Sequence, residues 1–373
     1  MMGSYKESFR LLCILILIGG SILFLESRKV SVPDRNSTNS DIKTLTGSGK
    51  AKQYVSAKEI STPDGFINTD AISIADLIGK NVILIDFWTY SCINCQRTLP
   101  YLNAWYEKYA DQGLEIIGIH TPEFDFEKEY ANVERAVQKF GIKYPIVLDN
   151  DYSTWQAYKN QYWPRKYLID IDGFVVYDHI GEGGYDETEA KIVALLNERN
   201  RALGVTNDIR TDTTAPRDVS SVDFSKVGSP EMYFGSTRIQ YLSNIPAQAC
   251  LSDVCTYNTP HVVAFNNYAL DGVWSIEPER ALLKSTHGSI TLRFSASKVN
   301  LVAGSTRPVK AKVYLDGQLI QNNSEGAHVT DGVVIFNTYD LYNLVDLRGN
   351  YGEHTLRIDI LDTGLQAFAF TFG

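Results

Sequence analysis

Two cysteines three positions apart, Cys92 and Cys95, are the residues of this chain best suited to chemistry. They follow residues 82–88, a strongly β-forming apolar run, and so fall where a strand would give way to a helix. Free N–H groups and the dipole at a helix N-terminus stabilise a thiolate, which is the nucleophile in disulfide exchange. A second sulfur three residues along the helix faces the first and can close a disulfide with it. The spacing therefore indicates a redox dithiol.

A zinc site is the alternative that a Cys-x-x-Cys pair raises. The next cysteines, Cys250 and Cys255, come about 155 positions after Cys95, in a β-rich region. No histidine stands at ligand spacing beside Cys92. Redox chemistry is therefore favoured over metal binding, and we expect neither a metal nor a cofactor.

Around the dithiol, strand-like apolar runs alternate with helical patterns, which is typical of a sheet wrapped by helices. We assign residues 57–205 to this α/β domain. The expected strands are residues 82–88, 114–120, 144–148, 165–170 and 174–180, the last two forming a hairpin about Asp172-Gly173. The expected helices are residues 93–110, interrupted by Pro100, and residues 127–140, 154–159 and 187–202.

A second domain of a different kind follows. Residues 206–226 are rich in Thr, Asp, Ser and Pro, which indicates a linker. Residues 227–373 contain short runs of alternating apolar and polar residues separated by Gly-containing turns, a pattern that predicts an all-β jelly-roll sandwich. The expected strands are residues 289–295, 309–315, 333–336, 354–361 and 367–372.

The N-terminal region, residues 1–26, contains fifteen uncharged residues at 11–25 and is expected to be a single apolar helix that serves as a membrane anchor or a secretory signal. An uncleaved anchor is favoured, because the expected position has no small-x-small cleavage site. Residues 27–56 are polar with little periodicity, which predicts a flexible tether. We therefore expect both domains outside the cytoplasm, in a periplasm or at the cell surface, where disulfides persist.

The net charge of −9 lies entirely on the first domain, where residues 57–205 hold 14 Lys+Arg against 23 Asp+Glu. Such a balance argues against a nucleic-acid partner, which would need a basic face. Ordinary solubility charge is the favoured interpretation, and a cationic redox partner is the alternative.

Several motifs are similar to those of one family: Phe87-Trp88-Thr89-Tyr90-Ser91-Cys92-Ile93-Asn94-Cys95, His120-Thr121-Pro122-Glu123-Phe124, Tyr162-Trp163-Pro164, Tyr167-Leu168-Ile169-Asp170, Gly181-Glu182-Gly183, Ser229-Pro230-Glu231-Met232-Tyr233-Phe234-Gly235 and Phe370-Thr371-Phe372-Gly373. Through them, residues 57–202 resemble a thioredoxin-fold domain of the TlpA-like kind. About four-fifths of the chain resembles the soluble part of DipZ-type proteins, which join such a domain to a β-sandwich resembling carbohydrate-binding modules. DipZ-type proteins also carry a multi-helix membrane electron conduit, and here one apolar segment replaces it. The resemblance thus implies a separate membrane or soluble electron donor.

The resemblance also implies roles for the residues at the dithiol. Cys92 would attack a partner's disulfide, and the more buried Cys95 would resolve the mixed disulfide. Asp86 matches the buried aspartate that takes and returns the proton of Cys95 through water, although an ordinary buried carboxylate is the alternative. Pro164 matches a cis-proline opposite the cysteines. The residues expected to contact the substrate are Trp88, Ile93, Asn94, Glu123, Trp163 and Pro164. A solvated loop carboxylate explains Glu123 equally well.

The second cysteine pair, Cys250 and Cys255, is expected to form a structural disulfide, with free thiols or a second redox pair as alternatives. Aromatic residues of the sandwich would suit either sugar-binding platforms or the core, and the core is favoured. They are Tyr233, Phe234, Tyr268, Trp274, Tyr339 and Tyr342.

These observations favour a membrane-tethered, extracytoplasmic thiol–disulfide oxidoreductase that exchanges disulfides with partner proteins. A thiol peroxidase that uses Cys92 is one alternative. A surface-attachment protein that binds glycans through the β-sandwich is another.

Overall fold

The α/β domain is built on a seven-stranded sheet in the order β1-β7-β6-β3-β4-β5-β2. The structure, a computed structural model, describes residues 47–217, 219–251 and 253–373. Strands β3, β4 and β5 are parallel, and the other pairs are antiparallel. The strands are β1 Val55–Ser56, β2 Gly65–Ile67, β3 Val82–Trp88, β4 Leu114–His120, β5 Ile146–Leu148, β6 Arg165–Ile169 and β7 Phe174–Ile180.

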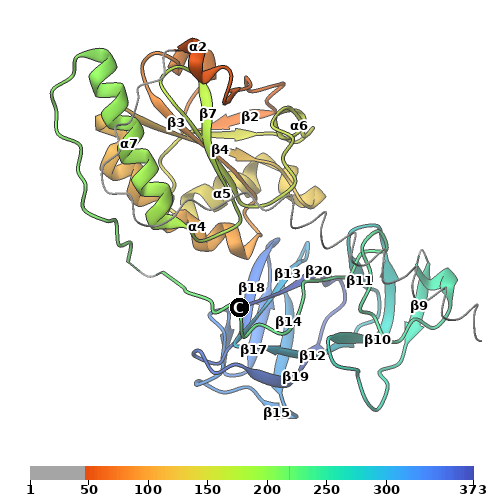
Figure 1. Ribbon diagram of the computed structural model, residues 1–373. Helices are drawn as coiled ribbons and strands as arrows, with labels where there is room; N and C mark the ends of the chain where they lie inside the picture. The colour runs from red at the N-terminus through yellow and green to blue at the C-terminus, as the bar shows by residue number, and fades with distance from the viewer. Residues whose placement is uncertain (1–46, 218, 252) are drawn as a thin grey trace, which may run out of the picture. The chain divides into compact units, whose positions relative to one another are not determined.

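Helices cover both faces of this sheet (Figure 1). They are α2 Gly47–Lys50, α3 Ile74–Leu77, α4 Ile93–Tyr109, α5 Tyr130–Lys139, α6 Ser153–Ala157 and α7 Tyr185–Leu203, with 3-10 turns at Ala110–Gln112 and Asp125–Lys128. Side chains of β3 alternate between the faces, as a strand requires: Leu84 and Trp88 pack with α4, α5 and α7, and Phe87 packs on the side of α3 and α6. The helix expected at residues 127–140 begins only at Tyr130, because Asp125–Lys128 form a 3-10 turn first.

The C-terminal domain is all β, as the alternating pattern predicts. Its hydrogen-bonded strands follow the order β16-β17-β14-β19-β12-β10-β11-β20-β13-β18, with β15, β8 and β9 paired to its members. The strands are β8 Met232–Tyr233, β9 Val254–Tyr257, β10 Asn267–Ile276, β11 Ala281–Leu283, β12 Gly288–Ala296, β13 Lys298–Gly304, β14 Val309–Leu315, β15 Gln318–Leu319, β16 Val329–Thr330, β17 Val333–Phe336, β18 Asp340–Asp346, β19 Gly352–Ile360 and β20 Gln366–Phe372, with a 3-10 turn at Gln248–Leu251.

Strand β10 is shared by the two halves of this β domain. Residues 267–271 pair with β12, whereas residues 274–276 pair with β11. Between them lies Gly272 at φ +102°, a backbone conformation that favours glycine, and a Cβ there would lie 2.8 Å from the carbonyl oxygen of His287. The glycine therefore lets one strand serve both halves around a single apolar core.

Both domains belong to one compact unit, Gly47–Gly373. The apolar cluster beneath α4 and α5 continues into Val302, Leu341 and Phe368 of the β domain. Phe126 contributes most directly, with its ring 4.7 Å from Phe368 and 5.2 Å from Tyr339, centroid to centroid.

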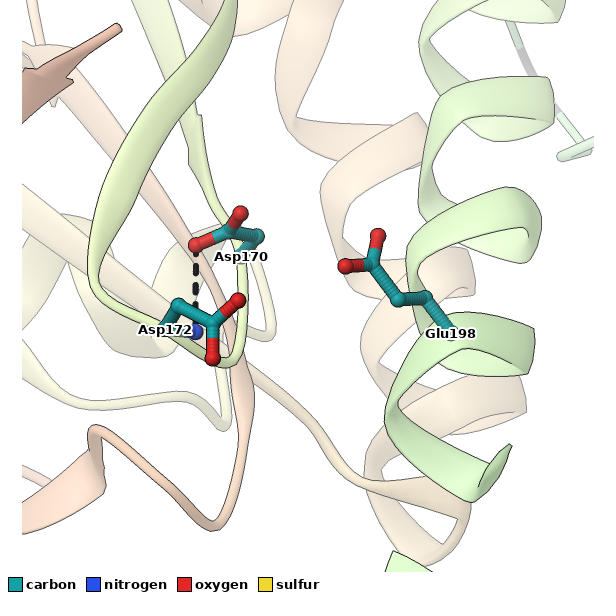
Figure 2. A group of neighbouring side chains, drawn as sticks. All are labelled: Asp170, Asp172 and Glu198. Atoms are coloured by element: carbon teal, nitrogen blue, oxygen red, sulfur yellow. Dashed lines mark hydrogen bonds between the residues drawn. The ribbon is translucent and has the colours of Figure 1, made fainter. Parts of the chain in front are cut away.

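The first described residues fold onto the α/β domain. Residues 47–56, predicted as the end of the tether, instead form α2 and the strand β1, which pairs with β7. The Lys50 ammonium binds Asp170 and Asp172 at 2.7 Å each and also contacts Glu198. Figure 2 shows these three carboxylates facing one another, two from the β6–β7 hairpin and one from α7. Because the one Lys50 ammonium contacts all three carboxylates, the cluster anchors the end of α2 to this domain.

Lys50→Met is expected to lower the free energy of unfolding by about 2 kcal/mol, because it leaves the carboxylates without their cation. The loss is limited because Asp172 is 44% exposed, so solvent screens its charge. Urea unfolding measures the change. Lys52→Met, at an exposed position two residues away, is the control and should leave the midpoint unchanged. Equal midpoints for the two variants would contradict the anchoring role.

The expected anchor or signal at residues 1–26 and most of the tether lie outside the described residues. Among the residues that the structure describes, no helix has both the length and the apolar character needed to cross a membrane.

Candidate active site

The dithiol lies where β3 ends and α4 begins. Cys92 occupies the N-cap position, and its sulfur accepts a hydrogen bond from the backbone N–H of Cys95 at 3.3 Å. The side chain is partly exposed, so another molecule can reach it. A sulfur in this position lies where the helix N-terminus stabilises negative charge.

Cys95, in contrast to Cys92, is shielded from solvent. It is 1% exposed, and both cysteines are reduced in this structure. Burial, together with the hydrogen bond to Cys92 and the charge on that sulfur, raises the pKa of Cys95 well above its usual value. Cys95 must therefore give up a proton to a neighbouring base before it can attack.

Asp86 is a buried carboxyl group whose charge acts on this thiol. It lies on β3, is 1% exposed, and its charge is among the causes that raise the pKa of Cys95. Burial raises the pKa of Asp86 to about 7, even though the positive charge of Lys166 acts to lower it. A carboxyl group with a pKa near neutrality can both accept and return a proton, as general acid–base chemistry requires.

A second buried carboxylate fixes the loop before Cys92. One oxygen of Glu127 accepts hydrogen bonds from the Ser91 hydroxyl at 2.6 Å and the Ser91 N–H at 3.3 Å. The other oxygen accepts the N–H groups of Glu123 and Phe124 at 2.5 Å and 3.0 Å. Burial and the charge of Glu123 raise the pKa of Glu127 to about 7, against these hydrogen bonds. The Glu127 side chain thus ties the residue beside the dithiol to the loop after β4.

The first turn of α4 is held from the other side. Arg97 makes a bidentate pair with Glu182, at 2.7 Å and 2.6 Å, and donates to the Asn94 side chain at 2.5 Å. Charge-assisted pairs of this geometry restrict both partners. The Gly181-Glu182-Gly183 motif therefore positions the start of the helix on which the dithiol lies.

The Trp163–Pro164 peptide bond is cis, as the family resemblance implies. Trp163 is partly exposed; its indole N–H donates to the Thr121 carbonyl at 3.0 Å, and its ring lies 4.3 Å from that of Trp155. Pro164 itself is buried. The indole of Trp163 is thus held in place by both a hydrogen bond and contact with the tilted ring of Trp155.

Comparison with known proteins agrees with this geometry. The family model described as AhpC/TSA family matches residues 55–178, and the model described as Thioredoxin like C-terminal domain matches residues 229–373. Protein DipZ of Mycobacterium tuberculosis (strain CDC 1551 / Oshkosh) is 35% identical over 342 residues, which cover 91% of this chain and 46% of DipZ. Thiol-disulfide oxidoreductase ResA of Bacillus thuringiensis is 35% identical over 128 residues, which cover 33% of this chain and 70% of ResA. The chain belongs to the thioredoxin-like family that includes DipZ and ResA.

This thioredoxin-like chain spans about half the length of the DipZ proteins it matches. Among solved structures, one described as a thioredoxin-like protein in the oxidised form is 26% identical, with a TM-score of 0.37, over 39% of this chain and 97% of that protein.

Two expected substrate contacts are placed differently from the prediction. Trp88 is wholly buried in the core beneath α4, so the expectation that it touches a docked substrate is wrong, because a partner cannot reach it. Glu123 is only 16% exposed; its carboxylate accepts hydrogen bonds from Tyr233 at 2.9 Å and Arg238 at 2.7 Å, both in the β domain. The Glu123 carboxylate therefore makes a contact between the two domains and is not a solvated loop carboxylate.

Ile93, Asn94 and Trp163 remain partly exposed and stay candidates for substrate contact, whereas the Pro164 side chain is buried. In the β domain, Cys250 and Cys255 form the expected disulfide. Most of the aromatic residues weighed as sugar platforms are buried: Phe234, Tyr268 and Trp274 are 0% exposed and Tyr342 is 4% exposed. Such side chains pack the core and cannot present a face to a sugar.

Sequence reasoning missed three buried polar residues near the dithiol: Glu127, Tyr144 and Lys166. Lys166 gave only a weak signal, because Arg165 directly before it and Asp170 after the strand are charged as well. Glu127 had none, because it stood at the expected start of a helix, where an acidic residue is ordinary.

Proposed function

We propose that this chain is a thiol–disulfide oxidoreductase that exchanges disulfides with partner proteins through Cys92 and Cys95. The observation that carries the proposal is the contrast between the two sulfurs. Cys92 is accessible at the N-terminus of α4, and Cys95 is buried three residues later beside Asp86.

The reaction follows from this contrast. The Cys92 thiolate attacks one sulfur of a partner's disulfide, and the partner's other sulfur leaves as a thiolate that takes a proton from solvent. Cys95 then passes its proton toward Asp86, and its thiolate attacks Cys92. The first partner sulfur leaves as a thiolate and is protonated in turn. The dithiol loses two electrons and the partner disulfide gains them, so a separate electron donor must reduce Cys92 and Cys95 again.

We further propose that the chain acts outside the cytoplasm, tethered to a membrane through residues 1–26. The uncharged run at residues 11–25 and the Cys250–Cys255 disulfide support this location, because structural disulfides persist in oxidising compartments. The partners would be disulfide- or dithiol-bearing proteins. Glycan binding by the β domain remains a weaker proposal, since its buried aromatic residues do not favour it.

The test is the reduction potential of the Cys92/Cys95 couple, measured on the full-length chain in glutathione buffers. A reduction potential of about −270 mV would mean that the chain acts as a reductant, and one of about −120 mV that it acts as an oxidant. Failure of the pair to oxidise and reduce reversibly would refute the proposal. A reduction potential does not distinguish a disulfide-exchanging protein from a thiol peroxidase, which the AhpC/TSA match also allows. Peroxide consumption with stoichiometric disulfide formation, without exchange with disulfide-bearing proteins, would favour that alternative.

A further inference from the structure

Asp86 lies in a row of paired residues that crosses the sheet beneath the dithiol. It pairs with Lys166 on β6 and with Gly118 on β4. Directly paired residues on neighbouring strands project from the same face. That face is the one covered by α4, because Leu84 and Trp88, two residues to either side of Asp86, pack with Cys95. Lys166 and Gly118 therefore flank Asp86 on the side of the buried thiol.

Gly118 leaves space that Ile146, Trp88 and Tyr144 share. A Cβ on Gly118 would lie 2.5 Å from Cδ1 of Ile146, 3.0 Å from Nε1 of Trp88 and 3.2 Å from Cε2 of Tyr144. Tyr144, in the segment before β5, is 0% exposed. Its ring therefore lies over the backbone of β4, directly beside the strand position of Asp86.

Three polar atoms around this glycine lack hydrogen-bond partners among the residues that the structure describes. They are Oδ1 of Asp86, Nε1 of Trp88 and the hydroxyl of Tyr144, all buried. The Lys166 ammonium donates to the Gly181 carbonyl at 3.1 Å, which uses one of its three hydrogens. Buried polar groups are normally satisfied, and an internal water with several polar neighbours is the usual bridge.

We propose that Tyr144 and Lys166 are positioning residues for proton transfer between Cys95 and Asp86. The Tyr144 hydroxyl holds the water through which the proton passes, and the Lys166 charge keeps the Asp86 carboxyl able to ionise. This inference rests on the proposed thiol–disulfide exchange and deepens it. In the resolving step, the Cys95 proton moves through that water to Asp86, the Cys95 thiolate bonds to Cys92, and the partner's thiolate leaves.

Charges around the pair agree with this assignment. Lys166 is the cation that faces Asp86, and burial lowers the pKa of Lys166 while Asp86, Cys95 and Glu182 act to raise it. The other titratable groups that face this site are Cys92 from α4, Tyr144 from before β5, and Tyr185 from α7, whose ring centroid lies 5.8 Å from the Lys166 ammonium. His120 packs on Trp88 on the same face of β4, and burial lowers its pKa to about 3, so it stays neutral.

The resolving step can be timed by itself in the full-length chain. The disulfide of two thionitrobenzoates, dithiobis(nitrobenzoate), reacts first at Cys92 and releases one coloured thionitrobenzoate thiolate. Cys95 then attacks the Cys92 sulfur and releases the second thionitrobenzoate. The first release reports Cys92 and the fold, whereas the second reports Cys95 and its base. Stopped-flow measurements of both releases from pH 5 to pH 9 give two separate pH profiles.

Tyr144→Phe should slow the second release about tenfold at every pH, since it removes only the hydroxyl. Lys166→Met should move the midpoint of the second profile upward by about one pH unit, because Asp86 loses the cation that favours its ionised form. The first release should stay within about twofold of wild type in both variants. Tyr106→Phe is the matched control: its ring lies 5.8 Å from that of Tyr144, and removing its hydroxyl should change neither release.

An unchanged second release in Tyr144→Phe, or an unshifted profile in Lys166→Met, would overturn the proposal. If Lys166→Met does not fold, Lys166→Gln replaces it, because glutamine keeps a donor for Gly181 and removes the charge. Absence of both releases in the wild-type chain would instead refute the proposed function, so the two failures are distinguishable.

Discussion

Replacing Cys92 with serine is expected to abolish disulfide exchange, with turnover reduced by about a thousandfold or more. A serine hydroxyl does not ionise near neutral pH and forms no disulfide, so the first step has no nucleophile. Cys95 cannot take over, because it is 1% exposed and burial raises its pKa well above the usual value. Reduction of a protein disulfide by the full-length chain, with dithiothreitol as the electron donor, measures the loss.

Cys95→Ser tests the other half of the same mechanism. Cys92 still attacks, but the mixed disulfide is not resolved, so a covalent complex with the partner accumulates. Non-reducing electrophoresis detects this complex, and a reductant cleaves it. A double Cys250→Ser, Cys255→Ser variant serves as the cysteine control, since that disulfide lies in the β domain, and should retain turnover. Exchange at the wild-type rate in Cys92→Ser would contradict the assignment of the nucleophile.

The dithiol and its supporting elements were predictable because their signals are local. Strands β3 and β4 begin and end at the residues that the apolar runs indicate, and α4 begins directly after Cys92. The N-cap position of Cys92 follows from the strand-to-helix transition alone. The burial of Asp86 follows from its position within a run of apolar residues.

Strands β10, β13 and β18 were not expected from the sequence, and for β13 the reason is physical. It lies between two apolar clusters, with Leu301 in the core of the β domain and Val302 in the cluster beneath α4. A strand buried on both faces loses the alternation that identifies a half-exposed strand. Strand β20 is also buried throughout, but it was expected from the sequence, at residues 367–372.

The remaining features of the site depend on contacts between distant parts of the chain. Lys166 lies beside Asp86 only through strand pairing, and Tyr144 only by packing near Gly118 on the next strand. Glu123 meets Arg238 only because the β domain packs against the loop after β4. One sequence does not contain the pairing of strands so far apart. The sequence therefore predicts the dithiol and the buried Asp86, whereas the structure is needed to find the buried polar residues packed around them.

Asp86→Asn is expected to remove a pH dependence of stability that the wild-type chain shows between pH 5 and pH 8. Burial raises the pKa of Asp86 to about 7. The unfolded value is about 3.9. Between these values the folded chain keeps a proton that the unfolded chain releases. The stabilisation is therefore complete below about pH 4 and is lost as the pH rises through about 7.

From pH 5 to above pH 7 the loss is about two pKa units, or about 3 kcal/mol in the free energy of unfolding. Urea unfolding of the reduced chain at intervals of one pH unit measures it. Glu127 titrates abnormally in both proteins and Asp86 is not among the causes of its shift, so its contribution cancels in the difference between wild type and Asp86→Asn. Asp70→Asn, at an exposed position, is the control and should follow the wild-type curve.

Parallel curves for wild type and Asp86→Asn would show that Asp86 is ionised in the folded chain throughout this range. The carboxylate could then accept the Cys95 proton only weakly, because a base with a low pKa has little affinity for it. Diverging curves would instead show that burial near Cys95 holds the pKa of Asp86 close to neutral pH. That is the property on which the resolving step depends.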